Sequence, residues 1–187
     1  MPSLSSLVSR LSCLFLVAAA VLATPARGEA QRRARLDAQL GAHLTHRAED
    51  RTVRPATRLQ LSVEAAGPVE VGVYVQAVAR ELPLKAPLFG GGLSLAVRPL
   101  IPGTPLRPLL QASAGYAAMP GDQMRSYGTL DVAVVGGVAV EVSEVVALEV
   151  RAGHHWLLGL PDAATLRHRH WSASAGLSFS WNGARSF

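Results

Sequence analysis

Four histidines are the residues of this sequence best suited to specific chemistry. They lie near the ends of segments in which apolar and polar residues alternate, and they are His43, His155, His168 and His170. Neutral imidazole nitrogens bind Zn²⁺ and Cu²⁺, and imidazole also changes charge near physiological pH. If the four side chains meet at one end of a sheet, the pattern predicts a metal site or a pH-responsive plug. The alternative is a solvated rim hydrogen-bonded to Glu and Arg.

A second set of polar residues consists of charges of both signs, spaced along the same alternating segments. They are Glu64, Glu70, Arg80, Arg98, Asp131, Glu141, Glu149 and Arg151. If these side chains line the interior of a narrow barrel, they must neutralise one another, because an unpaired buried charge is strongly unfavourable. We therefore expect an interior network of ion pairs.

Hydrolytic chemistry has less support. The lipid A deacylase family has a His-x-Ser-Asn motif, and neither His154 nor His155 is followed by Ser two residues later. Glu149 has the opposite strand parity to His154, so the two side chains cannot share a face. A triad needs a nucleophile, a base and an orienting group within hydrogen-bond reach, and the pattern predicts none. We expect no enzymatic activity and no organic cofactor, with a lipid A-modifying hydrolase as the remaining enzymatic alternative.

The composition limits which class of protein this chain can belong to. The 187 residues suffice for one domain with its own core, and 49% apolar with 17% charged residues excludes a disordered polymer. The apolar residues are mostly Val, Leu and Ala, and aromatic residues make up only 5%. No apolar run reaches the roughly 18 residues that a membrane-spanning helix needs.

The first thirty residues have the plan of a secretory signal peptide. A polar start is followed by the apolar block Leu11–Ala23 and then by small residues. Cleavage is expected after Ala23, Ala26 or Ala30. We expect residues 1–30 to be the signal peptide and residues 31–187 to be the folded domain. Cys13, the single cysteine, would be removed, so the mature chain would have no disulfide and no thiolate site.

The predicted mature chain begins with the basic residues Arg32, Arg33 and Arg35. Such a run can contact anionic lipid or nucleic acid. Export makes nucleic acid a poor partner, so we expect a solvated terminus and no nucleic-acid binding. The segment Ala30–Leu40 has residues that permit a helix at its start.

From Leu36 onward, apolar residues recur at every second position, which is the period of a β-strand. Eight segments alternate between a Val, Leu and Ala face and a polar face: 36–45, 58–65, 69–80, 93–98, 110–116, 130–142, 146–153 and 170–181. This number and length of strands predicts an all-β fold, a single eight-stranded antiparallel up-and-down transmembrane β-barrel.

The connections between these segments alternate in length. The short connections are residues 66–68, 101–105 and 143–144, and the longer ones are 47–56, 81–90, 119–127 and 158–167. Outer-membrane barrels have this asymmetry, with short periplasmic turns and longer external loops. Gly90, Gly91 and Gly92 are expected to give loop flexibility before the fourth strand. A soluble barrel that binds a small apolar ligand remains the leading alternative, because its strands also alternate.

Two segments carry a family resemblance: VVGGVAVEVSEVVALEVRAGHHW at 134–156 and SAGLSFSW at 174–181. They resemble the closing hairpins of the OmpA-type eight-stranded outer-membrane β-barrel domains. The resemblance implies a bacterial outer-membrane location, contact with lipid and recognition by the barrel-assembly machinery. The residues expected to carry that recognition are Leu177, Phe179, Trp181 and Phe187.

The resemblance identifies architecture, not activity. Side chains fill an eight-stranded barrel, so a general open pore is disfavoured. We expect a monomer with a structural or surface-interaction role.

Overall fold

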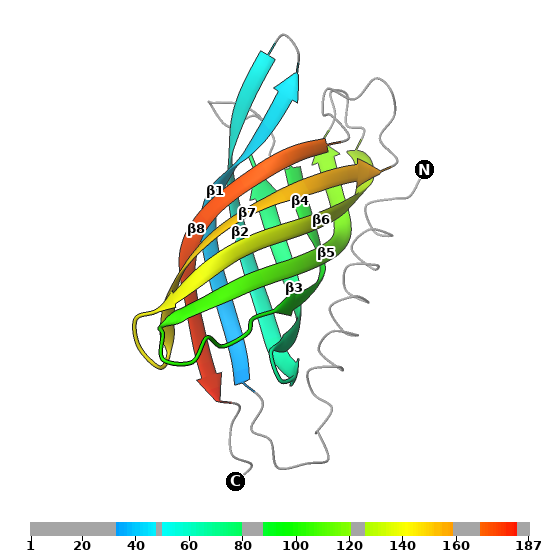
Figure 1. Cartoon of the computed structure of the whole chain (residues 1–187). Coiled ribbons are helices and arrows are strands. Elements are labelled where there is room, and N and C mark those ends of the chain that lie inside the picture. The colour runs from blue at the N-terminus through cyan, green and yellow to red at the C-terminus, as the bar shows by residue number, and fades with distance from the viewer. Residues whose placement is uncertain (1–32, 48–49, 80–87, 121–125, 159–168, 183–187) are drawn as a thin grey trace.

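The computed structural model describes residues 33–47, 50–79, 88–120, 126–158 and 169–182. The strands are β1 (Arg33–Arg47), β2 (Asp50–Ala66), β3 (Val69–Val78), β4 (Leu88–Val97), β5 (Leu106–Pro120), β6 (Ser126–Glu141), β7 (Val146–Leu158) and β8 (Arg169–Asn182). Consecutive strands pair antiparallel, and β1 also pairs with β8, so the sheet closes on itself (Figure 1). The predicted eight-stranded barrel is confirmed.

The apolar face of every strand points outward. In β4, for example, Leu95 is 51% exposed whereas its neighbours Ser94 and Ala96 are 4% and 1% exposed. The inward positions hold mainly charged, amide, hydroxyl and small side chains. The interior formed by the described residues is therefore polar, which argues against a soluble carrier with an apolar ligand inside.

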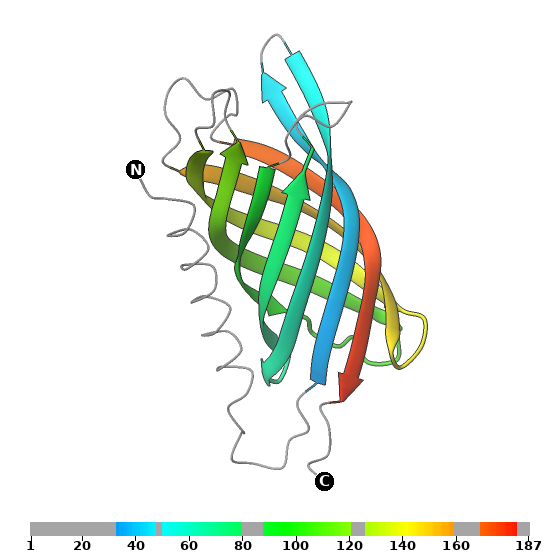
Figure 2. The ribbon, with the colours of Figure 1, turned by 180° about the vertical axis from the view of Figure 1, so that it is seen from behind.

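The hairpin of β1 and β2 is longer than the sequence predicts. The sequence pattern predicts a loop over residues 47–56, but β2 begins at Asp50 and Leu44 pairs with Val53. This pairing continues to Arg47 and Asp50, and the two strands project past the barrel wall as a ribbon (Figure 2). β-branched residues such as Val53 favour the extended backbone of this ribbon.

The expected helical start of Ala30–Leu40 is wrong over residues 33–40, because β1 begins at Arg33. This part of β1 pairs with β2 on one side and with β8 on the other. Backbone pairing along both edges outweighs the weak helix propensity of the segment.

The three consecutive glycines lie inside β4 instead of in the preceding loop. A Cβ at Gly92 would overlap the backbone of Ala114 and Gly115 on β5. A Cβ at Gly115 would lie 2.6 Å from the hydroxyl oxygen of Tyr74. These glycines therefore permit close approach of β4 and β5 and leave room for the inward ring of Tyr74.

The two ends of the barrel differ in their connections. The start of β1, the end of β8 and the connections 67–68, 98–105 and 142–145 lie together at one end, here called the terminal end (Figure 1). The opposite end is called the distal end. Among the described residues, no helix is long and apolar enough to cross a membrane. The predicted signal peptide, residues 1–30, lies outside the described residues.

Candidate functional site

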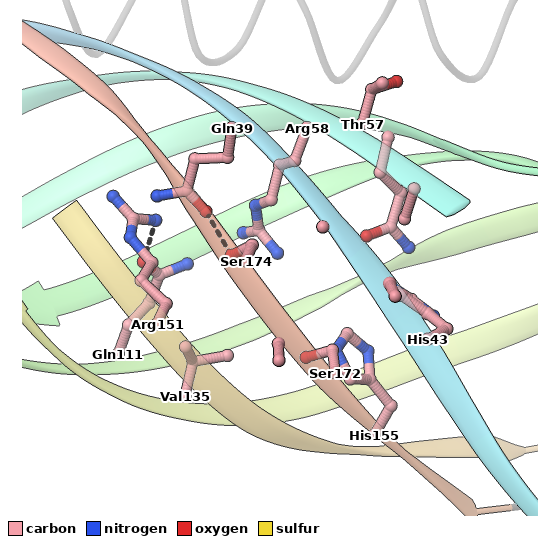
Figure 3. Close-up of a pocket in the computed structure, with 15 residues that line it drawn as sticks. Gln39, His43, Thr57, Arg58, Gln111, Val135, Arg151, His155, Ser172 and Ser174 are labelled. Atoms are coloured by element: carbon pink, nitrogen blue, oxygen red, sulfur yellow. Dashed lines mark hydrogen bonds between the residues drawn. The ribbon is translucent and has the colours of Figure 1, made fainter. Parts of the chain in front are cut away.

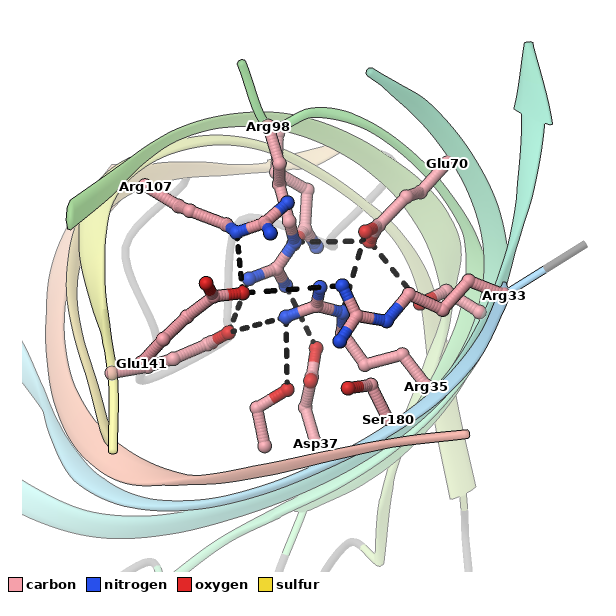
Figure 4. A network of polar contacts seen from close by, with 12 residues as sticks. Arg33, Arg35, Asp37, Glu70, Arg98, Arg107, Glu141 and Ser180 are labelled. Carbon is pink, nitrogen blue, oxygen red and sulfur yellow. Dashed lines mark hydrogen bonds and ion pairs between the residues drawn. The ribbon is translucent and has the colours of Figure 1, made fainter. Parts of the chain in front are cut away.

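Six charged side chains meet inside the barrel toward the terminal end, and we call them the charged plug (Figure 4). They are Arg35, Asp37, Glu70, Arg98, Glu149 and Arg151. Three are cations and three are carboxylates, so their formal charges cancel. Such a balance is what a buried set of charges requires.

Arg98 is the centre of the charged plug, because its guanidinium contacts all three carboxylates. Its Nε donates to Glu70 Oε2 at 2.9 Å and its Nη2 donates to Asp37 Oδ2 at 3.0 Å. Its Nη1 donates to Glu149 Oε1. Arg98 follows the last residue of β4, and the strands that carry its partners are β1, β3 and β7. The contacts therefore tie together strands that are not all neighbours in the sheet.

The other two arginines complete the pairing. Arg151 Nη2 donates to Asp37 Oδ2 at 2.6 Å and to Glu149 Oε2. Arg35 lies 3.3 Å from Glu70 and 3.7 Å from Glu149, measured from guanidinium nitrogen to carboxylate oxygen. Asp37 is 0% exposed and Glu149 is 2% exposed. Water is therefore almost excluded from this cross-section of the barrel.

Amide side chains form the next layer toward the distal end. Gln39 donates to Glu149 Oε2 at 3.2 Å, and Gln111 accepts from Arg151 Nη1 at 3.2 Å. Gln111 also donates to Gln60 Oε1 at 3.0 Å. These amides bind atoms of Glu149 and Arg151 in addition to the ion pairs, and their side chains occupy the lumen on the distal side of the charged plug.

A smaller group of charges lies at the terminal opening itself. Glu141 lies 3.9 Å from Arg33 and 2.5 Å from Arg107, and all three side chains are partly exposed. Because these charges remain hydrated, each pair contributes little to stability. They form a rim at the terminal opening, and Figure 4 labels all three side chains.

The predicted charges are distributed among these groups. Glu70, Arg98, Glu149 and Arg151 join the charged plug, Glu141 joins the rim, and Asp131 lies nearer the distal end. Glu64 is partly buried but makes no ion pair with a described residue. Arg80 lies outside the described residues.

Two members of the charged plug, Arg35 and Asp37, are absent from the predicted set of interior charges. The expectation that Arg35 belongs to a solvated terminus is wrong, since its side chain is only 5% exposed. β1 begins at Arg33 and its odd-numbered residues point inward. Extending the alternation backward from Leu36 by one residue identifies Arg35, and Asp37 already lies on the predicted polar face.

Three of the four predicted histidines come together toward the distal end, and we call His43, His155 and His170 the histidine cluster. Their ring centroids are 4.6 to 4.9 Å apart. They belong to β1, β7 and β8, which are consecutive around the closure of the barrel. His168 lies outside the described residues.

His155 is the best-anchored ring of the histidine cluster. Its Nδ1 lies 3.1 Å from Asp131 Oδ1, and its Nε2 lies 3.0 Å from Ser172 Oγ. Gln76 Nε2 donates to the other oxygen of Asp131 at 2.8 Å. Ser172, His155 and Asp131 are therefore connected in that order, an arrangement that the sequence pattern does not predict.

The space beside this set is small. A cavity of about 40 Å³ lies next to His155 and Ser172 and is also lined by Gln76, Gln111 and Arg151 (Figure 3). This volume has room for a few water molecules, since one water needs about 10 to 15 Å³ on the same measure. It does not hold the acyl chain of a lipid ester.

Comparison with known proteins bears on the fold. No family model and no curated protein matches the chain. The crystal structure of Neisserial surface protein A (NspA) is similar, with a TM-score of 0.59 and 17% identity, covering 82% of this chain and 99% of that chain. The N-terminal β-barrel domain of Pseudomonas aeruginosa OprF has a TM-score of 0.57 and 14% identity, covering 80% and 97%. The attachment invasion locus protein Ail of Yersinia pestis has a TM-score of 0.52 and 12% identity, covering 81% and 99%.

The fold is that of the eight-stranded outer-membrane β-barrels. At these identities the likeness concerns the architecture, including the predicted OmpA-type layout. On this barrel, the outward side chains of β8 include the exposed residues Leu177, Phe179 and Trp181. These are three of the four residues expected to serve as an assembly signal, and Phe187 lies outside the described residues.

Proposed function

We propose that the chain is a monomeric outer-membrane protein of Gram-negative bacteria with a structural or surface-interaction role, and that its barrel does not conduct solutes. The observation that carries this proposal is the charged plug. Its three cations and three carboxylates occupy the lumen at this level of the barrel. Because they neutralise one another, the lumen offers no unpaired charge that would attract a permeating ion. Eight-stranded barrels in general have interiors filled by side chains.

The apolar outer surface of the barrel supports the proposal that membrane lipid is a partner of this protein. Every strand presents outward apolar residues, and the exposed set is dominated by Leu and Val. A cavity of about 350 Å³ on this surface is lined by Leu59, Val75, Phe89 and Tyr116 among others. Its walls are mostly apolar, which suits a lipid acyl chain.

The proposed orientation places the terminal end in the periplasm and the distal end outside the cell. It rests on the alternation of short and long connections that the sequence predicts, because the short turns of outer-membrane barrels are periplasmic. The barrel-assembly machinery would then recognise the β8 row of Leu177, Phe179 and Trp181. An epitope inserted between Arg47 and Asp50, in the projecting ribbon, should be stained by antibody on intact cells. The same epitope inserted at 142–145 should be stained only after permeabilisation, and the reverse pattern would refute the orientation.

Conductance in planar bilayers tests the closed barrel. The refolded protein should give no steady single-channel current. A double variant, Arg98→Ala with Glu149→Ala, removes one cation and one carboxylate, keeps the formal charge neutral and should create measurable conductance. Arg33→Ala at the hydrated rim is the matched control and should stay silent. Steady current through the unmodified protein would refute the proposal.

The hydrolase alternative has one observation in its favour, the connection of Ser172, His155 and Asp131. The cavity beside it is too small for an acyl substrate, and an oxyanion would also need aligned donors. A fluorophosphonate probe labels an activated serine. We expect no labelling, and labelling that disappears in Ser172→Ala would instead establish a nucleophilic serine.

A further inference from the structure

We propose that the histidine cluster binds one divalent transition-metal ion, with Zn²⁺ and Cu²⁺ as the ions of best-matched chemistry. His43, His155 and His170 can each offer one ring nitrogen, and these atoms lie within 4.8 Å of one another. The three residues come from the consecutive strands β1, β7 and β8. The inference is independent of the proposed membrane role, because it rests only on the barrel interior.

His170 provides the strongest observation. Its side chain is only 6% exposed, and neither ring nitrogen has a hydrogen-bond partner among the described residues. Buried polar atoms nearly always have a partner, so two unpartnered nitrogens on one buried ring require a reason. The rings of His43 and His155 both stack on the His170 ring at 4.6 Å, centroid to centroid, with interplanar angles of 30° and 13°, so binding one ion requires the rings to turn their nitrogens toward it. His170 is thus held between two other possible ligands.

His155 has the support that metal-binding histidines commonly show. Its Nδ1 lies 3.1 Å from the Asp131 carboxylate, which is itself fixed by Gln76. A carboxylate behind a ligating histidine sets the ring orientation and raises the basicity of the other nitrogen. With the proton on Nδ1, Nε2 accepts a hydrogen bond from Ser172 Oγ, and a metal ion bound at Nε2 would replace that hydroxyl contact.

The donor set selects the class of metal. Three imidazoles with a carboxylate behind one of them favour Zn²⁺ and Cu²⁺ over Mg²⁺ and Ca²⁺, which prefer oxygen ligands. His43 and His155 also line the small cavity that contains Ser172 and Ser174 (Figure 3). That cavity has room for water, so a further ligand can come from solvent.

Calorimetry with ZnCl₂ tests the site on refolded protein in detergent micelles after treatment with EDTA. We expect one saturable equivalent of Zn²⁺. His155→Ala and His170→Ala should each weaken binding at least tenfold, and Asp131→Asn should weaken it about ten- to hundredfold through its effect on His155. Bound metal should also raise the midpoint of thermal unfolding of the unmodified protein.

His154→Ala is the matched control, because His154 neighbours His155 on β7 but packs outward against Trp156 and Trp171. This variant should bind Zn²⁺ as the unmodified protein does. Heat-dependent gel mobility checks that each variant is folded, and Asp131→Asn preserves side-chain shape if an alanine variant fails to fold. The proposal is overturned by absent saturable binding, by binding that survives both His155→Ala and His170→Ala, or by loss in His154→Ala.

Discussion

The charged plug and the histidine cluster occupy the same lumen but satisfy their polar groups in opposite ways. In the plug, three arginines face three carboxylates, and Arg98 alone contacts all three. In the cluster, His155 contacts the Asp131 carboxylate, and the buried ring of His170 has no hydrogen-bond partner among the described residues. The plug balances its charges within the chain, although Asp37 Oδ1 has no hydrogen-bond partner among the described residues. The cluster leaves both nitrogens of one buried ring, His170, without such a partner.

The largest effect is expected from Arg98→Ala. Removing this guanidinium leaves Asp37, Glu70 and Glu149 buried with two cations between them, which should lower the free energy of unfolding by about 3–5 kcal/mol. Urea unfolding in micelles, followed by tryptophan fluorescence, measures the change. Arg33→Ala at the rim is the control and should lose less than about 1 kcal/mol. Equal losses in the two variants would remove the distinction between plug and rim.

His155→Ala should have the next largest effect. Asp131 loses one hydrogen-bond partner but keeps Gln76, so we expect a loss of about 1–3 kcal/mol. The same unfolding experiment in EDTA isolates this loss from any effect of bound metal. Ser172→Ala, which removes only a hydroxyl contact to His155, should cost less. A larger loss in Ser172→Ala would show that the serine, not the carboxylate, anchors the ring.

The sequence predicts the charged plug better than the histidine cluster. Strict alternation alone places Glu70, Arg98 and Glu149 inside the barrel, because side chains on a strand have a period of two. It cannot show that Arg98 meets all three carboxylates, since those contacts cross the lumen between strands that are far apart in sequence. Strand parity also brings three histidines to one end. Their ring spacing and the missing partners of His170 depend on register and side-chain packing.

The limits of the strands are harder to predict than their number. The sequence pattern places Arg35 in a solvated terminus and the ribbon of β1 and β2 in a loop. Both errors arise where polar residues continue a strand beyond its apolar part, because the alternation is then weak. Most of the polar stretch 47–56 is strand because it pairs across the hairpin, which no local pattern reveals.

Arg107→Ala should cause a smaller loss of stability than Arg98→Ala, and the two variants compare a partly exposed ion pair with a buried one. Arg107 pairs with Glu141 at the partly exposed rim, so its removal should lower stability by about 0.2–1 kcal/mol. The loss should shrink in 1 M salt, where exposed charges are screened within roughly 3 Å. The loss in Arg98→Ala should persist in the same salt. Parallel unfolding series at low and high salt provide the comparison, and an Arg107→Ala loss that salt does not reduce would contradict it.

His170→Leu should have the smallest effect on the metal-free protein. The imidazole has no hydrogen-bond partner to lose among the described residues, so replacing it with an apolar group of similar size should change stability by less than about 1 kcal/mol. Unfolding in EDTA measures this change. A loss above about 2 kcal/mol would mean that the ring is satisfied by an interaction other than a metal ion.

The projecting ribbon also affects how neighbouring molecules meet. Residues 45–47 of β1 and 50–52 of β2 pair with each other and with no other described strand, so each segment has an open backbone edge. Open edges recruit strands from other chains, and charges and proline are the usual protection. Arg47, Asp50, Arg51 and Arg54 are followed by Pro55 along this ribbon. The charged residues and proline of this segment make its strands hard to recognise in the sequence, and we expect the same composition to discourage strand exchange between neighbouring barrels.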